Sequence, residues 1–144
     1  MKSILVICVG NICRSPMAEA LLAQKLPALH VRSAGVGALI GHPADPMAQT
    51  LMAERGIDIA KHRARQVNRS MCQEVDLVLT MDDAQKRFIE QSYTFTRGRV
   101  YRIGEAAKVN VPDPYKEGRD AFENALRLID AGVQIWAERI RKLS

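Results

Sequence analysis

A cysteine and an arginine separated by five residues stand near the amino terminus, in the stretch VICVGNICRSP at residues 6–16. Cys8 ends a run of apolar, mostly β-branched residues that is typical of a buried strand. The loop that follows contains Gly10 and Asn11, two residue types that readily adopt positive φ. Such a loop can curl so that successive backbone N–H groups point inward. The spacing from Cys8 to Arg14 therefore predicts an anion-binding loop at the end of a strand.

This loop combines the groups needed for nucleophilic attack on a phosphate ester. The loop N–H groups, the dipole of a following helix and the guanidinium of Arg14 would cradle a tetrahedral dianion. The same positive field would favour the thiolate form of Cys8 and place it beneath the phosphorus. A cysteine and an arginine at this spacing could also be a buried strand residue and an ordinary turn. The anion loop is favoured by the residues that accompany the pair: Gly10, Asn11, Ser15 and Pro16.

The elements that must position this loop alternate between strands and helices. Apolar runs predict strands over residues 4–9, 30–35, 76–81 and 99–103. Helical patterns and capping residues predict helices from Ser15-Pro16 onward, over 45–55, after Asp82 or Asp83, and over 120–142. Ser15 is expected to be the N-cap of the first helix, with Glu19 in its first turn. The alternation predicts a parallel sheet with right-handed crossovers, whose ligands bind at the carboxyl ends of the strands, where Cys8 lies.

The apolar side chains of the last helix recur at steps of three and four. This stripe is expected to be core, and it consists of Phe122, Leu126, Ile129, Val133, Trp136 and Ile140.

Composition indicates one globular domain over residues 1–144, with 47% hydrophobic and 26% charged residues. No apolar run approaches the roughly 20 residues of a membrane helix, so membrane insertion is not expected. Three cysteines fit no disulfide framework and favour a reducing cytoplasm. The net charge of +5 favours anionic partners, but aromatics are only 5% and are not interleaved with basic runs, which argues against nucleic acid. The basic segment at 62–69 is expected to be a solvated face.

Neither a metal nor a cofactor is expected. The cysteines and histidines lack the spacing of a zinc site, and the chain has neither a GxGxxG nor a Walker loop.

The sequence resembles the low-molecular-weight protein tyrosine phosphatases over nearly its whole length. Segments that fall where this family has its own versions are CVGNICRSP at 8–16, SAG at 33–35, ADP at 44–46, HRARQ at 62–66, DLVLTMD at 76–82 and VPDPY at 111–115. The resemblance implies a four-stranded parallel sheet flanked by helices on both faces, a flavodoxin-like three-layer sandwich. It also implies a phosphotyrosine protein phosphatase that works through a phosphocysteine intermediate.

Carried over residue by residue, the resemblance assigns roles around the loop. Asp113, held between two prolines, matches the general acid that protonates the leaving tyrosine and then activates water. The phosphate would be bound by Val9, Gly10, Asn11, Ile12, Cys13, Arg14 and Ser15. Ile12 and Tyr115 match the substrate cleft, and Leu39 stands where many relatives have a second aromatic residue. Ser15, Ser33 and His62 match the residues that hold Asn11 in a strained conformation, and Ser15 would also donate to Cys8.

Three other functions are compatible with parts of this pattern. An arsenate reductase on the same scaffold would need two further cysteines close together, whereas the chain offers only Cys72. A phosphoarginine phosphatase resembles this loop but has a threonine at the position of Ile12. A non-catalytic phosphopeptide-binding module would be expected to have lost Cys8, Arg14 or Asp113, and all three are present.

The resemblance also implies partners, and the position of Cys13 on the loop predicts a redox response. It is strongest to bacterial members that act on tyrosine autokinases of capsule or exopolysaccharide export, in the cytoplasm, releasing inorganic phosphate. Cys13, on the same loop, is expected to form a reversible disulfide with Cys8 after oxidation by peroxide. For that purpose both thiols are expected to lie in a field that favours the thiolate.

Overall fold

The computed structural model describes residues 1–143, and within them four parallel strands form one sheet in the order β2-β1-β3-β4. The strands are β1 (Ser3–Cys8), β2 (His30–Gly35), β3 (Leu77–Thr80) and β4 (Val100–Arg102). The helices are α1 (Arg14–Lys25), α2 (Pro46–Ala53), α3 (Arg69–Gln73), α4 (Asp83–Ser92) and α5 (Arg119–Arg141), with a 3₁₀ turn, η1, at Thr94–Thr96. The sheet and the alternation of strands and helices confirm the predicted fold class.

Strand β1 is paired with β2 and β3 along its two edges, and apolar clusters cover both of its faces. Successive side chains of a strand point to opposite faces. Ile4 and Val6 pack into one apolar cluster, whereas Leu5 and Ile7 pack into the other. Burial on both faces is the reason that this strand reads as an unbroken apolar run instead of alternating with polar residues.

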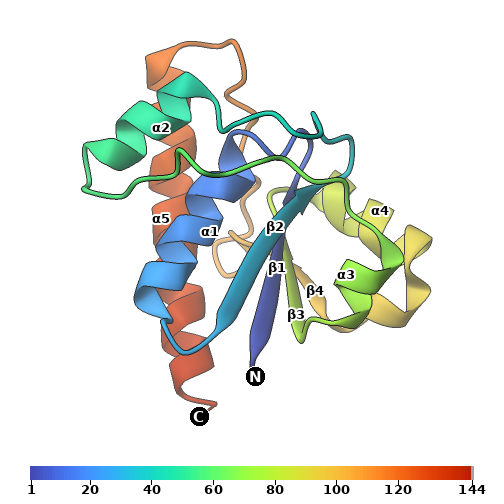
Figure 1. Ribbon diagram of the computed structural model, residues 1–144. Helices are drawn as coiled ribbons and strands as arrows, with labels where there is room; N and C mark the ends of the chain where they lie inside the picture. The colour runs from blue at the N-terminus through green and yellow to red at the C-terminus, as the bar shows by residue number, and fades with distance from the viewer. Residues whose placement is uncertain (144) are drawn as a thin grey trace.

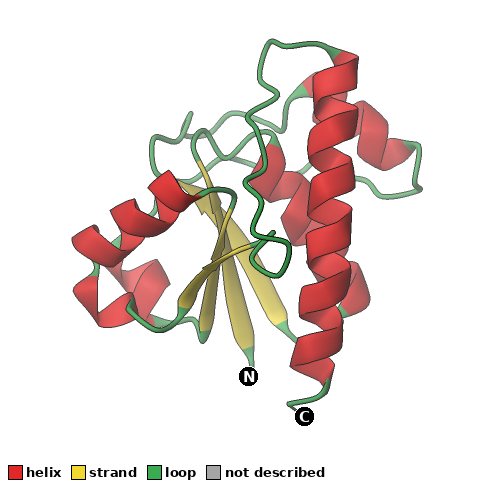
Figure 2. Cartoon of the chain, turned by 180° about the vertical axis from the view of Figure 1, so that it is seen from behind, coloured by secondary structure: helices red, strands yellow, loops and turns green. Residues whose placement is uncertain are grey.

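Two helical layers enclose the sheet. Helices α1, α2 and α5 cover one face, and α3 and α4 cover the other (Figure 1). Seen from behind, the long α5 runs along one side of the strands, and all the strands point toward the same set of loops (Figure 2). Cys8 is the last residue of the central β1, so the loop that follows it lies at the carboxyl edge of the sheet.

The expected boundaries differ from the observed ones mainly at the ends of elements. Strand β1 is shifted by one residue toward the amino terminus, β2 has the expected bounds, and β3 and β4 are each shorter by one residue at both ends. Helix α1 begins at Arg14, with Cys13 at its N-cap, so the expectation that Ser15 caps this helix was wrong. Ser15 lies inside the first turn, fully buried, and Glu19 lies beyond that turn. The short α3 was not expected.

The apolar stripe of α5 is buried as expected, except at one position. Trp136 is only partly buried at the edge of the core. Its indole N–H is shared between the carbonyl oxygens of Arg102 and Ile103, both at 3.1 Å. An indole needs a partner for its N–H, and the end of β4 supplies it, which holds the ring at the boundary.

Within residues 1–143, no helix is long and apolar enough to cross a membrane.

Gly35 ends β2 directly beside the loop that follows β1. A Cβ atom at this position would lie 2.3 Å from the carbonyl oxygen of Val9 and 3.1 Å from the backbone nitrogen of Asn11. Real Cβ atoms do not approach backbone so closely, so any larger residue must displace the loop. Glycine is therefore required here for close approach and not for a positive φ.

We expect Gly35→Ala to lower the free energy of unfolding by about 1–3 kcal/mol, because the added methyl group overpacks against backbone. Gly37→Ala is the matched control, since a Cβ there would make only an ordinary contact, at 3.9 Å from Val9. Urea unfolding should show a change within about 0.5 kcal/mol for the control. Equal losses in the two variants would contradict the close-approach argument.

Candidate active site

The carbonyl groups of the loop after β1 all accept hydrogen bonds from surrounding segments. The donors and distances are Val36 N to Cys8 O at 3.0 Å, Gly37 N to Val9 O at 3.0 Å, Leu39 N to Gly10 O at 3.1 Å, His62 Nε2 to Asn11 O at 2.6 Å, and Asp45 N to Ile12 O at 2.8 Å. Five consecutive carbonyls thus face away from the centre of the loop.

The outward carbonyls determine where the N–H groups point. In a trans peptide the C=O and the following N–H lie on opposite sides of the peptide unit. The N–H groups of residues 9–13 therefore turn toward the centre of the loop, where α1 also begins. An anion at that centre would meet several N–H donors and the positive end of a helix dipole.

Asn11 adopts the left-handed conformation that was predicted for this loop, with φ of 59°. Gly10, the other residue of the loop that readily adopts positive φ, does not have it. Asn11 Nδ2 donates to Ser15 Oγ at 2.7 Å and to Ser33 Oγ at 3.0 Å. Its Oδ1 accepts from the backbone N–H of Arg65 at 2.9 Å. Both amide hydrogens and the amide oxygen are used, which fixes the orientation of the side chain.

The segment 62–66 clamps Asn11 from outside the loop. His62 Nε2 contacts the carbonyl oxygen of Asn11, and a carbonyl can only accept, so this ring nitrogen carries the hydrogen. Arg65 contributes a second contact, from its guanidinium to the carbonyl oxygen of Ser33 at 3.2 Å. The expectation that residues 62–69 form only a solvated face was therefore wrong for His62 and Arg65. The resemblance identified His62, but nothing in the sequence identified Arg65, which acts partly through its backbone.

The hydrogen bonds around Ser33 extend one residue further than expected. Ser33 Oγ accepts from Asn11 and donates to Glu19 Oε1. Glu19 lies on α1 and is partly buried, so the loop, β2 and α1 share one chain of hydrogen bonds. The signal that could have revealed Glu19 is its place five residues after Arg14, on a helix that starts at the loop.

Cys8 Sγ lies 2.9 Å from Ser15 Oγ, and both residues are buried. Because Ser15 Oγ already accepts from Asn11, its single hydrogen is free to point at the sulfur. The hydrogen bonds from Asn11 through Ser15 therefore direct a hydroxyl group at the Cys8 sulfur.

The other two cysteines are in a different electrostatic environment. Burial raises the pKa of the Cys13 thiol, and the nearby Asp45 carboxylate raises it further. Burial also raises the pKa of Cys72, to about 11. The expectation that the loop favours a thiolate at both Cys8 and Cys13 was therefore wrong for Cys13. All three thiols are free, and a Cys8–Cys13 disulfide after oxidation stays a prediction.

Arg14 is 2% exposed and is held on more than one side. It donates to the carbonyl oxygen of Val111 at 2.8 Å. The Asp82 and Asp113 carboxylates each lie 3.8 Å from its guanidinium. Asp82 also caps α4 by accepting from Gln85 N, as expected. Its contact with Arg14 was not foreseen, although the order of the strands brings the end of β3 beside the end of β1.

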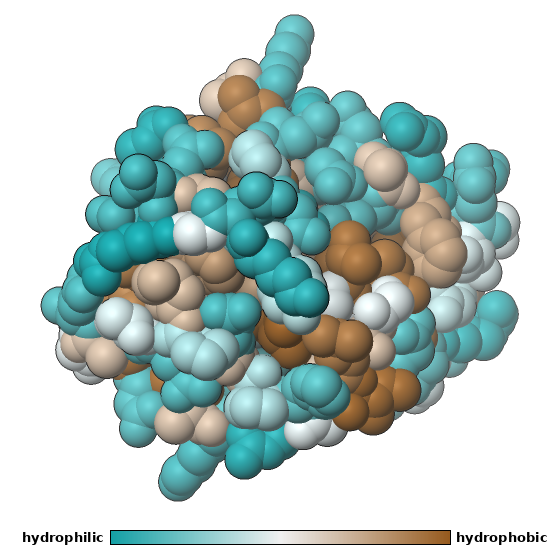
Figure 3. Space-filling view, turned by 90° about the horizontal axis from the view of Figure 1, so that it is seen from above, coloured by the Kyte–Doolittle hydropathy of each residue, from teal (hydrophilic) through white to brown (hydrophobic). Residues whose placement is uncertain are grey.

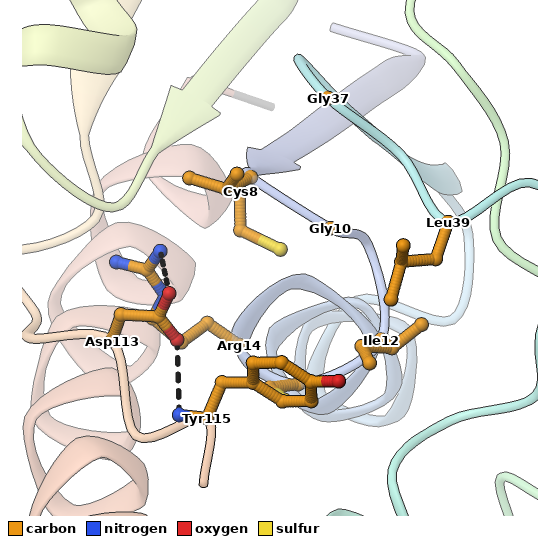
Figure 4. A pocket seen from close by; sticks show the side chains of 10 residues that line it. Cys8, Gly10, Ile12, Arg14, Gly37, Leu39, Asp113 and Tyr115 are labelled. Carbon is orange, nitrogen blue, oxygen red and sulfur yellow. Dashed lines mark hydrogen bonds and ion pairs between the residues drawn. The ribbon is translucent and has the colours of Figure 1, made fainter.

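Asp113 is carried on a loop that is anchored to the sheet. Val111 N donates to the carbonyl oxygen of Met81 at 2.8 Å, just beyond β3. Asp113 Oδ1 accepts from the backbone N–H of Tyr115 at 3.1 Å, while its side chain stays half-exposed (Figure 4). This turn leaves the carboxyl group at the mouth of the loop, on the same side as Cys8 and Arg14.

A pocket of about 170 Å³ opens over Cys8 and collects the predicted cleft residues. Ile12 and Leu39 lie on one side, and the ring of Tyr115 lies across from Leu39 (Figure 4). The pocket is therefore apolar at its mouth and positively polarised at its base. This combination suits a flat apolar group that carries a phosphate. Ser33 and His62 stay outside the pocket and act through Asn11.

Among residues 1–143, no group of three or more His, Cys, Asp or Glu residues is arranged to hold a metal ion.

Comparison with known proteins identifies relatives over the full length. The family model described as low molecular weight phosphotyrosine protein phosphatase matches residues 3–144. The probable low molecular weight protein-tyrosine-phosphatase EpsP of Ralstonia nicotianae is 52% identical over 143 residues, covering 99% of each chain. The structure of the tyrosine phosphatase Wzb from Escherichia coli K30 with sulphate has a TM-score of 0.93 at 36% identity, covering 96% of this chain and 98% of that one. The YwlE arginine phosphatase from Geobacillus stearothermophilus has a TM-score of 0.92 at 29% identity, covering 99% and 94%.

We expect iodoacetate near pH 8 to alkylate Cys8 at least about tenfold faster than Cys13 or Cys72. The anionic reagent is drawn to the loop, whereas a pKa of about 11 leaves Cys72 almost entirely protonated. Labelling of Cys72 should rise as the pH approaches 11, where its thiolate becomes populated. Mass spectrometry of the cysteine peptides over time measures the three rates.

In that experiment inorganic phosphate should protect Cys8, and Cys8→Ser should lack the fast phase. Labelling of Cys13 as fast as that of Cys8 would contradict the environments described above.

Proposed function

The chain belongs to the low molecular weight phosphotyrosine protein phosphatases, hydrolases that act on phosphotyrosine, and we propose that Cys8, Arg14 and Asp113 carry the reaction on it. The observation that supports this most directly is the 2.9 Å contact between Cys8 Sγ and the Ser15 hydroxyl. It directs a hydrogen-bond donor at the sulfur of a loop whose N–H groups converge. A nucleophile and an anion site then share one centre.

In the first step the Cys8 thiolate attacks phosphorus, and an S–P bond forms as the bond from phosphorus to the tyrosine oxygen breaks. The leaving oxygen takes up the bonding electrons, and Asp113 in its acid form gives it a proton. The half-exposed carboxyl group of Asp113 at the pocket mouth suits this role. The product of the step is phosphocysteine and an unphosphorylated tyrosine.

In the second step a water molecule attacks the phosphocysteine. The Asp113 carboxylate, now deprotonated, takes a proton from that water. The S–P bond breaks, its electrons return to sulfur, and inorganic phosphate leaves. The Ser15 hydroxyl stabilises the departing thiolate as it did the attacking one, so the same hydrogen bond serves both steps.

Arg14 is proposed to bind two phosphate oxygens with its planar guanidinium. These oxygens carry negative charge throughout the transfer, and fixed donors stabilise that charge in the transition state without reorganising. The carbonyl of Val111 and the carboxylate of Asp82 hold the guanidinium plane in advance. The inward N–H groups of residues 9–13 provide the remaining donors.

The pocket lining supports a tyrosine ester over the alternatives. Ile12 presents apolar bulk at the pocket, and Tyr115 offers a face on which a phenyl ring can stack. A phosphorylated guanidinium group, which is planar and polar, would gain nothing from the apolar Ile12. A redox cascade of the arsenate reductase type would have to use Cys72, which is fully buried and has a raised pKa. A binding-only module would not need the Ser15 contact to Cys8.

We further propose that the protein substrate is a bacterial tyrosine autokinase of polysaccharide export or one of its targets. The support is the sequence resemblance to members with such substrates, together with the 52% identity to EpsP. The reaction would then take place in the cytoplasm, where a reduced Cys8 is maintained.

Asp113→Ala should lower kcat by about 10²–10⁴ for aryl phosphates with poor leaving groups, because no acid then protonates the leaving oxygen. The loss should shrink for p-nitrophenyl phosphate, whose leaving group needs little protonation. Asp58→Ala is the matched control, since Asp58 makes the same side-chain turn, to Ala60 N at 2.8 Å, outside the pocket. Steady-state kinetics with substituted phenyl phosphates measure the dependence.

Cys8→Ser should abolish turnover of every ester in that series. Turnover that survives Cys8→Ser would overturn the proposed function, and equal losses for all leaving groups in Asp113→Ala would make Asp113 structural.

We expect phosphotyrosine peptides to be hydrolysed with a much higher kcat/KM than phosphoarginine peptides. Ile12→Thr should narrow that ratio by about tenfold or more, because a hydroxyl replaces apolar bulk beside the ester. Ile12→Val is the matched control, since it keeps an apolar β-branched side chain. Comparable rates on the two peptides in the unchanged protein would contradict the tyrosine preference.

A further inference from the structure

Two exposed apolar side chains, Val9 and Leu39, line the pocket, and the exposed Ile40 follows Leu39 in the chain. We call these three residues the apolar rim. Their exposed fractions are 42%, 37% and 69%. Val9 follows β1, whereas Leu39 and Ile40 follow β2. On the face that carries the loops at the carboxyl ends of the strands, apolar surface gathers in one region (Figure 3). An apolar cluster beside a functional pocket marks a surface that is covered when a partner binds.

The rim is fixed to the anion-binding loop by backbone hydrogen bonds. Gly37 N donates to Val9 O at 3.0 Å, and Leu39 N donates to Gly10 O at 3.1 Å. The rim therefore keeps its position relative to Cys8 before any partner arrives. A preformed surface binds without the entropic cost of being ordered.

Ile40 is the rim residue that the pocket itself does not use. Val9 and Leu39 line the pocket, but Ile40 does not. Its Cα lies about 3.8 Å from that of Leu39, just outside the wall. A small phosphate ester in the pocket would leave Ile40 in water. Only a substrate that continues beyond the phenyl ring can cover it.

Charge separates the two sides of the pocket mouth. The segment VGALIG at residues 36–41 contains no charged side chain. On the opposite side, Lys116 Nζ lies 5.3 Å from the centre of the Tyr115 ring. A charged residue of a substrate would have to lose water against the rim without finding a partner there.

We propose that the apolar rim, with Ile40 as its outermost contact, binds a bulky apolar side chain that flanks the phosphotyrosine of the protein substrate. This specificity rests on the proposed function, because the phosphotyrosine must occupy the pocket. The backbone of the substrate then passes over the mouth of the pocket, and each residue beyond the phosphotyrosine spans up to about 3.3–3.6 Å. A side chain one or two residues from the phosphotyrosine therefore lands on the rim.

The test compares phosphotyrosine peptides that differ only at the residues flanking the phosphotyrosine. One peptide carries leucine there, and the others carry serine, aspartate or lysine. The leucine peptide should have a kcat/KM about five- to tenfold higher than the serine peptide, from partial burial of an apolar side chain. The aspartate and lysine peptides should fall at or below the serine peptide.

Ile40→Asn should reduce the preference for leucine to about twofold or less, while the kinetics with p-nitrophenyl phosphate stay unchanged. Leu143→Asn is the matched control, because Leu143 is 71% exposed at the far end of the chain. That variant should keep the full preference.

Three results of the peptide comparison would contradict the proposed preference for an apolar flanking residue. They are an equal kcat/KM for all peptides, a preference for a charged peptide, or a leucine preference that survives Ile40→Asn. Occupation of the rim by a second copy of the chain would also overturn the proposed specificity. In that case the specific activity of the unchanged protein would fall as the enzyme concentration rises, and Ile40→Asn would remove this dependence. Failure of the proposed function is separate, because it would appear as no hydrolysis of p-nitrophenyl phosphate.

Discussion

The site depends on the outward hydrogen bonding of five successive carbonyl groups, from Cys8 to Ile12. A planar trans peptide cannot turn its C=O outward without turning the next N–H inward. An anion-binding centre is therefore produced by donors that lie outside the loop. These donors come from the segment after β2, the start of α2 and residue His62. The N–H groups of the loop therefore point inward only after the tertiary structure has formed.

Asn11 is held by hydrogen bonds to both its backbone carbonyl and its side chain. A left-handed conformation at a residue other than glycine costs of order 1–2 kcal/mol, and a fold keeps it only when its surroundings over-determine it. Here the side chain bonds to Ser15, Ser33 and the backbone of Arg65, and the backbone carbonyl bonds to His62. Several hydrogen bonds, each contributing about 1 kcal/mol net, are enough to offset that cost.

The sequence was most informative where a structural property depends on residues close together in the chain. The apolar run of β1 gave the strand, because burial on both faces leaves no polar position. The left-handed residue was limited to Gly10 or Asn11, and the structure selects Asn11. Ser15 was wrongly predicted to be a helix N-cap. A serine followed by a proline is typical of a helix N-terminus, and the sequence does not reveal whether the serine hydroxyl has another partner. Its partners are Asn11 and Cys8, which only the folded loop brings within reach.

Contacts between distant segments could be predicted only where the resemblance supplied them, as for Ser33 and His62, and Arg14 illustrates why the others could not. Its guanidinium meets Val111 and Asp82, which stand in different loops and reach it through the order of the strands. The Val111 contact has a second effect, because the backbone of Val111 is also bonded to Met81 at the end of β3. The loop that carries Asp113 is therefore fixed by the same arginine that we propose binds the phosphate. Cys8, the loop that follows it and Asp113 keep their relative positions because β1 and β3 are paired neighbours, and the carboxyl edge of that pair is the rigid support of the proposed reaction.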